Sequence, residues 1–209
     1  FLAENPAFAK ACEENGIIFI GPPSDVIEKL GNKVTARAIM AEAGISMVPG
    51  TDNLSPGDAG LEEARVFGAE YGYPIMLKAT AGGGGRGIRR IENESELKEQ
   101  YPLARSEALA AFHDDSVYLE KVVNNPKHVE VQIIADKTGK TVHLGTRDCS
   151  IQRRNQKLVE IAPAFQLSKE KAEEICQTAV QAAKAANYFN AGTVEFLLDS
   201  YDNYYFMEI

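Results

Sequence analysis

The sequence lacks several features that would indicate particular classes of protein. Basic residues are in the minority, and the net charge of −8 argues against a nucleic-acid-binding surface, which needs excess positive charge to neutralise phosphates. No apolar run approaches the length of a membrane span, and no signal-peptide pattern opens the chain. The three histidines are too few and too scattered to predict a histidine-rich metal centre; they are His113, His128 and His143.

Cysteine is also scarce, because the chain contains only Cys12, Cys149 and Cys176. The odd number and the absence of CxxC spacing exclude a disulfide framework and a zinc site of ordinary type. We therefore expect reduced thiols and a cytoplasmic location. The chain opens on Phe1 and not on Met, so we expect the natural protein to begin earlier.

What the sequence does contain is the composition of a globular protein, with 44% hydrophobic and 25% charged residues in a length sufficient for one large domain or two small ones. Alternating and helical patterns indicate separate helices mixed with antiparallel hairpins, which predicts an α+β fold. Ser24 is a predicted helix cap, and Ser168 is the predicted start of another helix. The predicted strands are residues 17–20, 74–79, 88–91, 117–120, 129–134, 141–146, 193–198 and 204–209, and the predicted helices include 33–43, 61–71 and one from residue 168.

The glycine-rich stretch from Lys78 to Gly87 is the first candidate binding element. Glycines allow several backbone N–H groups to face one anion, and Lys78 and Arg86 would add positive charge. The stretch contains GxGxxG, but residues 88–91 form a predicted strand where a dinucleotide site needs a helix. Phosphate binding and a merely flexible loop therefore both remain open.

Two glutamates in apolar runs form the second candidate site. If the strands around Glu195 and Glu208 pair across the polar turn at residues 200–203, the two carboxylates become cross-strand neighbours on one face. Like charges at that distance repel unless a cation lies between them, and oxygen ligands suit Mg²⁺. We therefore favour a metal site, although a register shifted by one residue would leave one glutamate in solvent.

A basic segment from Arg147 to Lys157 is the third candidate. Such a concentration of cations in an acidic chain indicates either an anion site or a solvated basic loop, and charge alone does not separate the two. Cys149, within it, is expected to be a packed small residue, since no neighbouring histidine would activate it.

Together these motifs resemble the biotin carboxylase component of biotin-dependent carboxylases, within the ATP-grasp superfamily. The resemblance extends over almost the whole chain, and its most specific part is the combination of the glycine stretch with the basic segment. The segments that carry it include Phe19-Ile-Gly-Pro, Gly31-Asn-Lys-Val, Lys78 to Gly87, Glu120-Lys, Lys127-His-Val-Glu-Val-Gln132, Arg147-Asp-Cys-Ser-Ile-Gln-Arg-Arg-Asn-Gln-Lys157, Ala162-Pro-Ala and Ala191-Gly-Thr-Val-Glu-Phe-Leu197.

The resemblance implies an ATP-grasp fold in three parts. Residues 1–49 would be the end of an N-terminal α/β domain with its linking helices, residues 50–122 a lid with the glycine loop, and residues 123–209 the start of a C-terminal antiparallel-sheet domain. It also implies roles for individual residues. Lys157 would be catalytic, and Glu195 and Glu208 would hold Mg²⁺, for which Mn²⁺ could substitute. The implied ATP-binding residues are Lys33, Lys78, Gly84, Gly85, Glu120, Lys121, Val123, His128, Gln152 and Asn155.

The implied reaction is the Mg·ATP-dependent carboxylation of biotin by bicarbonate through carboxyphosphate. Biotin would arrive on a carrier protein or domain, a carboxyltransferase would use the product, and the full-length enzyme would form a homodimer. Neither nucleic acid nor membrane is an expected partner. The final acceptor of the carboxyl group, whether acetyl-CoA, propionyl-CoA, pyruvate or urea, does not follow from this sequence.

Two features depart from the family pattern. Asn155 stands where the family usually has histidine, so we expect a phosphate contact to survive and proton-linked behaviour to be lost. The sequence also ends at Ile209, before the family's Asn-x-Arg-x-Gln-x-Glu segment, and we expect the 209-residue piece alone to be inactive. The alternatives are another ATP-grasp carboxylate–amine ligase, which the basic segment disfavours, and a non-catalytic nucleotide-binding module, which the retained lysines and glutamates disfavour.

Overall fold

The computed structural model describes residues 2–82, 87–153 and 156–209, and these form two compact units. The carboxylate unit, named after its glutamates, comprises residues 2–47, 125–153 and 157–209. The glycine-loop unit comprises residues 48–82, 87–124 and 156. No helix among the described residues is long and apolar enough to cross a membrane.

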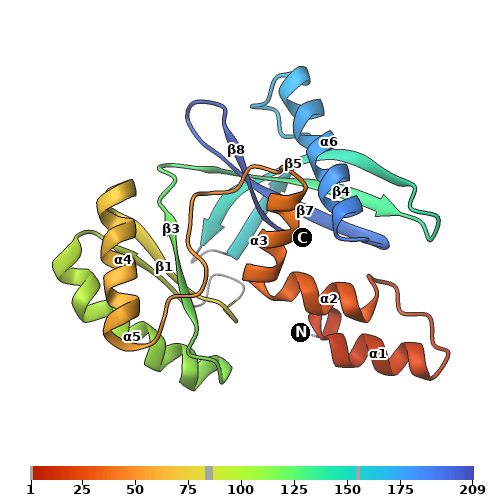
Figure 1. The fold of residues 1–209 in the computed structure, drawn as a ribbon. Coiled ribbons are helices and arrows are strands. Elements are labelled where there is room, and N and C mark those ends of the chain that lie inside the picture. Colours follow the sequence, from red (N-terminus) through yellow and green to blue (C-terminus); the bar gives the residue numbers. More distant parts are fainter. Residues whose placement is uncertain (1, 83–86, 154–155) are drawn as a thin grey trace. The chain divides into compact units, whose positions relative to one another are not determined.

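The carboxylate unit contains a five-stranded sheet in the order β6-β5-β4-β7-β8 (Figure 1). Every strand pair with a described register in this sheet is antiparallel. Four α-helices and one short 3-10 helix belong to the same unit. The elements are η1 (Leu2–Glu4), α1 (Pro6–Glu14), α2 (Ser24–Gly31), α3 (Lys33–Glu42), β4 (Lys127–Ala135), β5 (Thr141–Arg153), β6 (Gln156–Ile161), α6 (Lys169–Ala185), β7 (Asn190–Leu198) and β8 (Tyr204–Glu208).

Alternation along the strands gives this sheet two different faces. Val129, Val131 and Ile133 are fully buried, and Val131 and Ile133 pack in a core with Ile175 and Ala179 of α6, while the residues between them point to the other face. The helix predicted from Ser168 is present as α6, and Ser168 caps it by accepting a hydrogen bond from the Lys171 backbone N–H at 3.1 Å. One face of the sheet is therefore covered by apolar packing, and the other is available for charged groups.

Both predicted hairpins of this unit are present. The β4–β5 turn is closed by Asp136, whose side chain accepts hydrogen bonds from the backbone N–H groups of Thr138 and Lys140, and Gly139 takes the positive φ of 86° that the turn requires. In the β7–β8 hairpin, Glu195 pairs with Glu208 as predicted. That pairing depends on a register shift next to Glu195, which the sequence pattern did not predict.

The glycine-loop unit contains a three-stranded antiparallel sheet in the order β2-β1-β3, with two helices packed on it (Figure 1). Its apolar core includes Ile75 and Leu77 from the central strand and Leu97 from the longer helix. Asn93 caps that helix through a 3.0 Å hydrogen bond from the Glu96 N–H, as its spacing predicts. The elements are α4 (Gly57–Tyr71), β1 (Ile75–Ala79), β2 (Ile88–Ile91), α5 (Glu94–Phe112) and β3 (Val117–Lys121).

Two predictions for the N-terminal region are wrong. Residues 17–20 do not form a strand, because no described strand pairs with them, and Ile18 and Ile20 are 88% and 85% exposed. Ser24 does not cap α2; it is the first helical residue, and its N–H and hydroxyl both donate to the Glu13 carboxylate at 2.9 Å. In both cases the local sequence indicates one structure, but the presence or absence of tertiary partners decides the structure that forms.

Candidate functional site

A row of ionisable side chains crosses four strands of the carboxylate unit. In the strand register Arg147 of β5 lies opposite Glu130 of β4, Glu130 lies opposite Glu195 of β7, and Glu195 lies opposite Glu208 of β8. Directly opposed residues share a face of the sheet, so all four lie on the face away from α6. We call this set the ionic row. Three of its four members are carboxylates, which makes the row a site for cations.

Lys157 of β6 supplies one of those cations. Its Nζ donates to Glu130 Oε2 and to Glu195 Oε1, both at 2.5 Å, and so bridges two carboxylates from neighbouring strands. Burial lowers the pKa of the ammonium, but the hydrogen bonds to the two carboxylates outweigh burial and the pKa is raised. Lys157 is therefore a fixed positive charge at neutral pH.

Glu130 and Glu195 are held as carboxylates by the same contacts. Burial raises the pKa of the Glu195 carboxyl, but hydrogen bonds from His128 and Lys157 lower that pKa by more, so that the net shift is downward. For Glu130 burial again raises the pKa, and the hydrogen bonds from Lys157 and Arg147 lower it below its usual value. Glu130 and Glu195 thus keep their negative charges although burial alone would favour the protonated form.

Contacts of the His128 ring fix its tautomer. Gln152 Nε2 donates to the Cys149 carbonyl at 2.8 Å and lies 2.7 Å from His128 Nδ1. An amide nitrogen only donates, so Nδ1 is the acceptor and the ring proton is on Nε2. Nε2 then donates to Glu195 Oε2 at 2.8 Å. Gln152 and His128 together therefore orient the carboxylate of Glu195.

A register shift brings Glu208 to the ionic row. Phe196 pairs with Phe206, whereas the preceding Glu195 pairs with Glu208, so Met207 is an extra residue on β8, as in a β-bulge. Without the shift Met207 would lie opposite Glu195, and Glu208 would face the core. Lys33 of α3 contacts Glu208 Oε2 at 3.1 Å, and the Glu208 side chain is 45% exposed.

The glycine-loop unit carries the other predicted residues. Lys78 of β1 is hydrogen-bonded to Glu120 of β3, and both side chains are largely buried. The base of the glycine stretch is closed by a 2.8 Å hydrogen bond from the Ala79 N–H to the Gly87 carbonyl. Lys121 ends β3, with its N–H donating to the Pro49 carbonyl, and Val123 follows the strand with intermediate exposure. Gly84, Gly85 and Asn155 lie outside the described residues.

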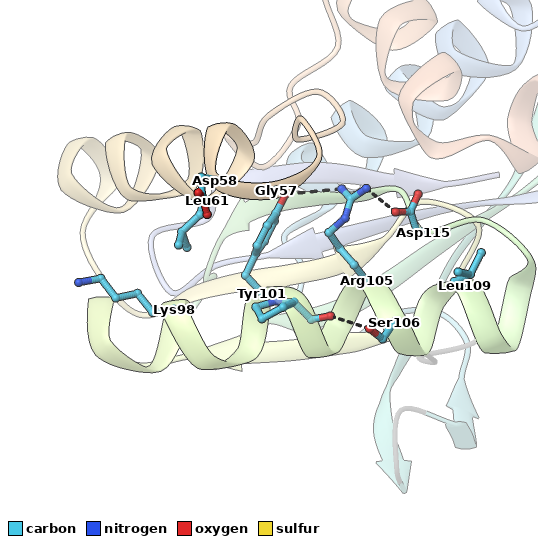
Figure 2. Close-up of a pocket in the computed structure, with 10 residues that line it drawn as sticks. Gly57, Asp58, Leu61, Lys98, Tyr101, Arg105, Ser106, Leu109 and Asp115 are labelled. Carbon is cyan, nitrogen blue, oxygen red and sulfur yellow. Dashed lines mark hydrogen bonds and ion pairs between the residues drawn. The ribbon is translucent and has the colours of Figure 1, made fainter.

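The same unit contains a cavity of about 420 Å³ between α4 and α5 (Figure 2). None of its ten lining residues is a predicted site residue, and its most buried cation is already paired. Arg105 binds Asp115 and lies 3.5 Å from the Tyr101 hydroxyl, which itself donates to the Ser55 carbonyl at 2.5 Å. These contacts attach the segment before α4 to α5, so the polar groups of the cavity have a structural role.

One further group of possible metal ligands occurs among the described residues. The ligand atoms of Glu130, Cys149 and Glu160 lie within 4.8 Å of one another. However, burial raises the pKa of the Cys149 thiol to about 12, which keeps the thiol protonated and unsuited to bind a metal. This group does not fit a metal ion.

The structure thus brings six predicted residues into one unit and four into the other. Lys33, His128, Gln152, Lys157, Glu195 and Glu208 belong to the carboxylate unit. Lys78, Glu120, Lys121 and Val123 belong to the glycine-loop unit. Sequence reasoning missed Glu130, and it did not identify the anion that Arg147 binds. The signal for Glu130 was a charged residue in a strand whose neighbours Val129 and Val131 are both apolar.

Comparisons with known proteins agree on one family. Residues 32–209 match the family model described as "Carbamoyl-phosphate synthase L chain, ATP binding domain", and residues 1–27 match "Biotin carboxylase, N-terminal domain". The pyruvate carboxylase of Bacillus subtilis (strain 168) is 53% identical over 209 residues, which cover 100% of this chain and 18% of that protein.

Solved structures give the same result. The biotin carboxylase domain dimer of Hydrogenobacter thermophilus 2-oxoglutarate carboxylase, in complex with MgADP, ADP and bicarbonate, matches with a TM-score of 0.92 and 51% identity. The Campylobacter jejuni biotin carboxylase β-γ-ATP complex matches with a TM-score of 0.93 and 45% identity. Each match covers 100% of this chain, but only 45% and 46% of the solved chains. The chain therefore spans less than half the length of these relatives.

Proposed function

This chain belongs to the biotin carboxylase family, and we propose that the full-length protein uses Mg·ATP to carboxylate biotin with bicarbonate. The observation that carries the proposal is the ionic row with Lys157 bridging Glu130 and Glu195. It combines acceptors for a divalent cation with a fixed ammonium for an anion. Phosphoryl transfer depends mainly on such positioned charges.

The proposed reaction has two steps. A bicarbonate oxygen attacks the γ-phosphorus of ATP, the bond to ADP breaks, and carboxyphosphate forms. Carboxyphosphate then releases phosphate and CO₂, and a ureido nitrogen of biotin adds to the CO₂ with loss of its proton. We assign to Lys157 the binding of the transferred phosphoryl group and bicarbonate, and to Lys33 and Lys78 the nucleotide phosphates.

The residues present fit a magnesium ion. Glu195 and Glu208 offer carboxylate oxygens from directly opposed strand positions, which is the donor type that Mg²⁺ and Mn²⁺ prefer. A hydrogen bond from His128 orients Glu195, and metal ligands are commonly oriented by such hydrogen bonds. When bound, the ion would neutralise negative charge on the nucleotide phosphates.

The remaining predicted residues stay assigned to nucleotide binding. In the carboxylate unit these are His128 and Gln152; in the glycine-loop unit they are Glu120, Lys121 and Val123, with Gly84, Gly85 and Asn155 of the undescribed segments. A biotin carrier and a carboxyltransferase are the proposed partners, and the dimer seen for the Hydrogenobacter thermophilus domain supports a proposed homodimer.

The test is ADP release by the full-length protein with Mg·ATP, measured with and without bicarbonate and free biotin. We expect bicarbonate-dependent release that biotin stimulates and that Glu195→Ala abolishes. Turnover indifferent to both would instead identify another ATP-grasp ligase. Nucleotide binding without turnover under any condition would identify a non-catalytic module and would reject the proposal.

A further inference from the structure

We propose that Arg147 is a positioning residue for this reaction, which acts through Glu130 to hold Lys157 in place. The inference rests on the proposed function for the role of Lys157, but its geometric basis is independent of that function. Arg147 is a cation of the basic segment, whose anion the sequence left undetermined. The structure places its guanidinium on the Glu130 carboxylate of the protein itself.

Glu130 is the most buried member of the ionic row, with a side chain that is only 3% exposed. Its two oxygens bind different cations: Oε1 accepts from Arg147 Nε at 2.5 Å and from a terminal guanidinium nitrogen, and Oε2 accepts from Lys157 Nζ at 2.5 Å. The orientation of the carboxylate therefore sets the position of the Lys157 ammonium. If the carboxylate lost one of its two cations, part of its buried charge would be uncompensated.

The guanidinium is itself fixed by a second strand. Arg147 Nη1 donates to Gln132 Oε1 at 3.1 Å, and Gln132 Nε2 donates to the Gly192 carbonyl of β7 at 2.9 Å. Because the guanidinium is planar, contacts on both its Nε side and its Nη1 side determine its plane. Lysine at this position would supply the charge but could not make both contacts.

Lys157 needs such an anchor because of where it starts. It belongs to β6, the edge strand of the order β6-β5-β4-β7-β8, and its ammonium reaches a carboxylate of β7. Glu130, on the intervening β4, holds the ammonium along the way. The four groups Arg147, Lys157, Glu130 and Glu195 carry two positive and two negative charges. Loss of Arg147 leaves an excess negative charge at Glu130, which pulls Lys157 away from Glu195.

The experiment compares Arg147→Met and Arg147→Lys in the full-length protein. For Arg147→Met we expect kcat for bicarbonate-dependent ADP release to fall about 10- to 100-fold, with a smaller change in KM for Mg·ATP. Arg147→Lys should recover part of kcat, because it restores the charge without the planar contacts. The matched control is Arg65→Met, which removes an exposed arginine that also binds two carboxylates, and it should leave kcat unchanged.

A crystal structure of Arg147→Met supplies the second measurement. We expect Lys157 Nζ to lose its hydrogen bond to Glu195 and to remain on Glu130. If Nζ still bridges both carboxylates, or if kcat is unchanged while the wild-type enzyme is active, the proposal is wrong. If the wild-type protein shows no bicarbonate-dependent release, the proposed function fails, and the position of Nζ still decides the role of Arg147.

Should Arg147→Met not fold, Gln132→Leu tests the same idea with every charge retained. It removes the acceptor that orients the guanidinium, together with the Gln132 donation to the Gly192 carbonyl. We expect a shift of Lys157 in the same direction and a fall in kcat near the low end of the range above. An unchanged kcat together with an unchanged Lys157 position in this variant would also overturn the proposal.

Discussion

The sheets of the two units are both antiparallel, yet they carry charge in different ways. In the carboxylate unit the charged partners come from β4, β5, β6, β7 and β8, and strand register brings them together. In the glycine-loop unit the Lys78–Glu120 pair joins two adjacent strands, and the remaining stability comes from an apolar core beneath two helices. The first arrangement fixes several charges to one sheet, and the second combines a charge pair on adjacent strands with an apolar core.

The largest effect should come from breaking the centre of the ionic row. Lys157→Met removes the ammonium that two carboxylates share, and we expect turnover of the full-length protein to fall on the order of 100- to 1,000-fold. The midpoint of thermal unfolding should change little, because Glu130 still binds Arg147 and Glu195 still binds His128. Lys140→Met, in the exposed β4–β5 turn, is the control. Turnover close to wild type would contradict the role assigned to Lys157.

The corresponding change in the glycine-loop unit should act on stability. Leu97 of α5 is fully buried in the core of that unit, and Leu97→Ala should lower the free energy of unfolding by about 2–5 kcal/mol. Urea denaturation measures the loss. Leu103→Ala on the same helix, at a side chain that is 51% exposed, should cost less than about 0.5 kcal/mol. Equal losses for the two variants would show that α5 is not held by this core.

A smaller effect should follow from filling the close contact between α4 and α5. A Cβ on Gly60 would lie 1.8 Å from the Ser55 carbonyl oxygen and 2.2 Å from the Tyr101 hydroxyl, so Gly60→Ala should destabilise the unit by about 1–3 kcal/mol. Gly31→Ala in α2 meets no atom within 4 Å and should stabilise by about 0.4–1 kcal/mol. Thermal or urea unfolding distinguishes the two, and a stabilising Gly60→Ala would disprove the contact.

The smallest expected effect concerns the chemical reactivity of two buried cysteines of the carboxylate unit, Cys149 and Cys176. Burial raises the pKa of the Cys149 thiol to about 12 and that of Cys176 to about 11, so both stay protonated through neutral and mildly alkaline pH. Because the thiolate is the reactive form, alkylation by iodoacetamide at pH 8 should be slow in the native protein and fast in urea. Mass spectrometry of the labelled peptides gives both rates. Rapid native labelling of Cys149 would indicate an exposed, activated thiol.

Local patterns predicted most of the fold. The alternation around Val129 and Val131, the helix from Ser168 and the turn at Asp136 each follow from the order of neighbouring residues, and each is present. Residues 17–20 failed for the opposite reason. Their apolar side chains indicate a strand, but a strand needs a partner, and no described strand supplies one.

The site was predictable in its residues more than in its contacts. Glu195 and Glu208 were found because two apolar runs flank one turn, and the pairing is present. Glu130 was not found, because alternation assigned it to a polar face and could not show that Arg147 and Lys157 converge on it. Those contacts depend on which strands are neighbours in the sheet, and a single sequence does not contain that order.

The extra residue on β8 has a consequence for how the β7–β8 hairpin can vary. Near the turn, Phe196 and Phe206 keep one register, and at Glu195 and Glu208 the ladder has another. A one-residue change in the length of the turn can therefore be accommodated at Met207, where the irregularity either moves along β8 or disappears. Removing Met207 itself would leave a regular ladder with the two glutamates still opposed. Changes in the length of the turn therefore need not alter the pairing of Glu195 with Glu208.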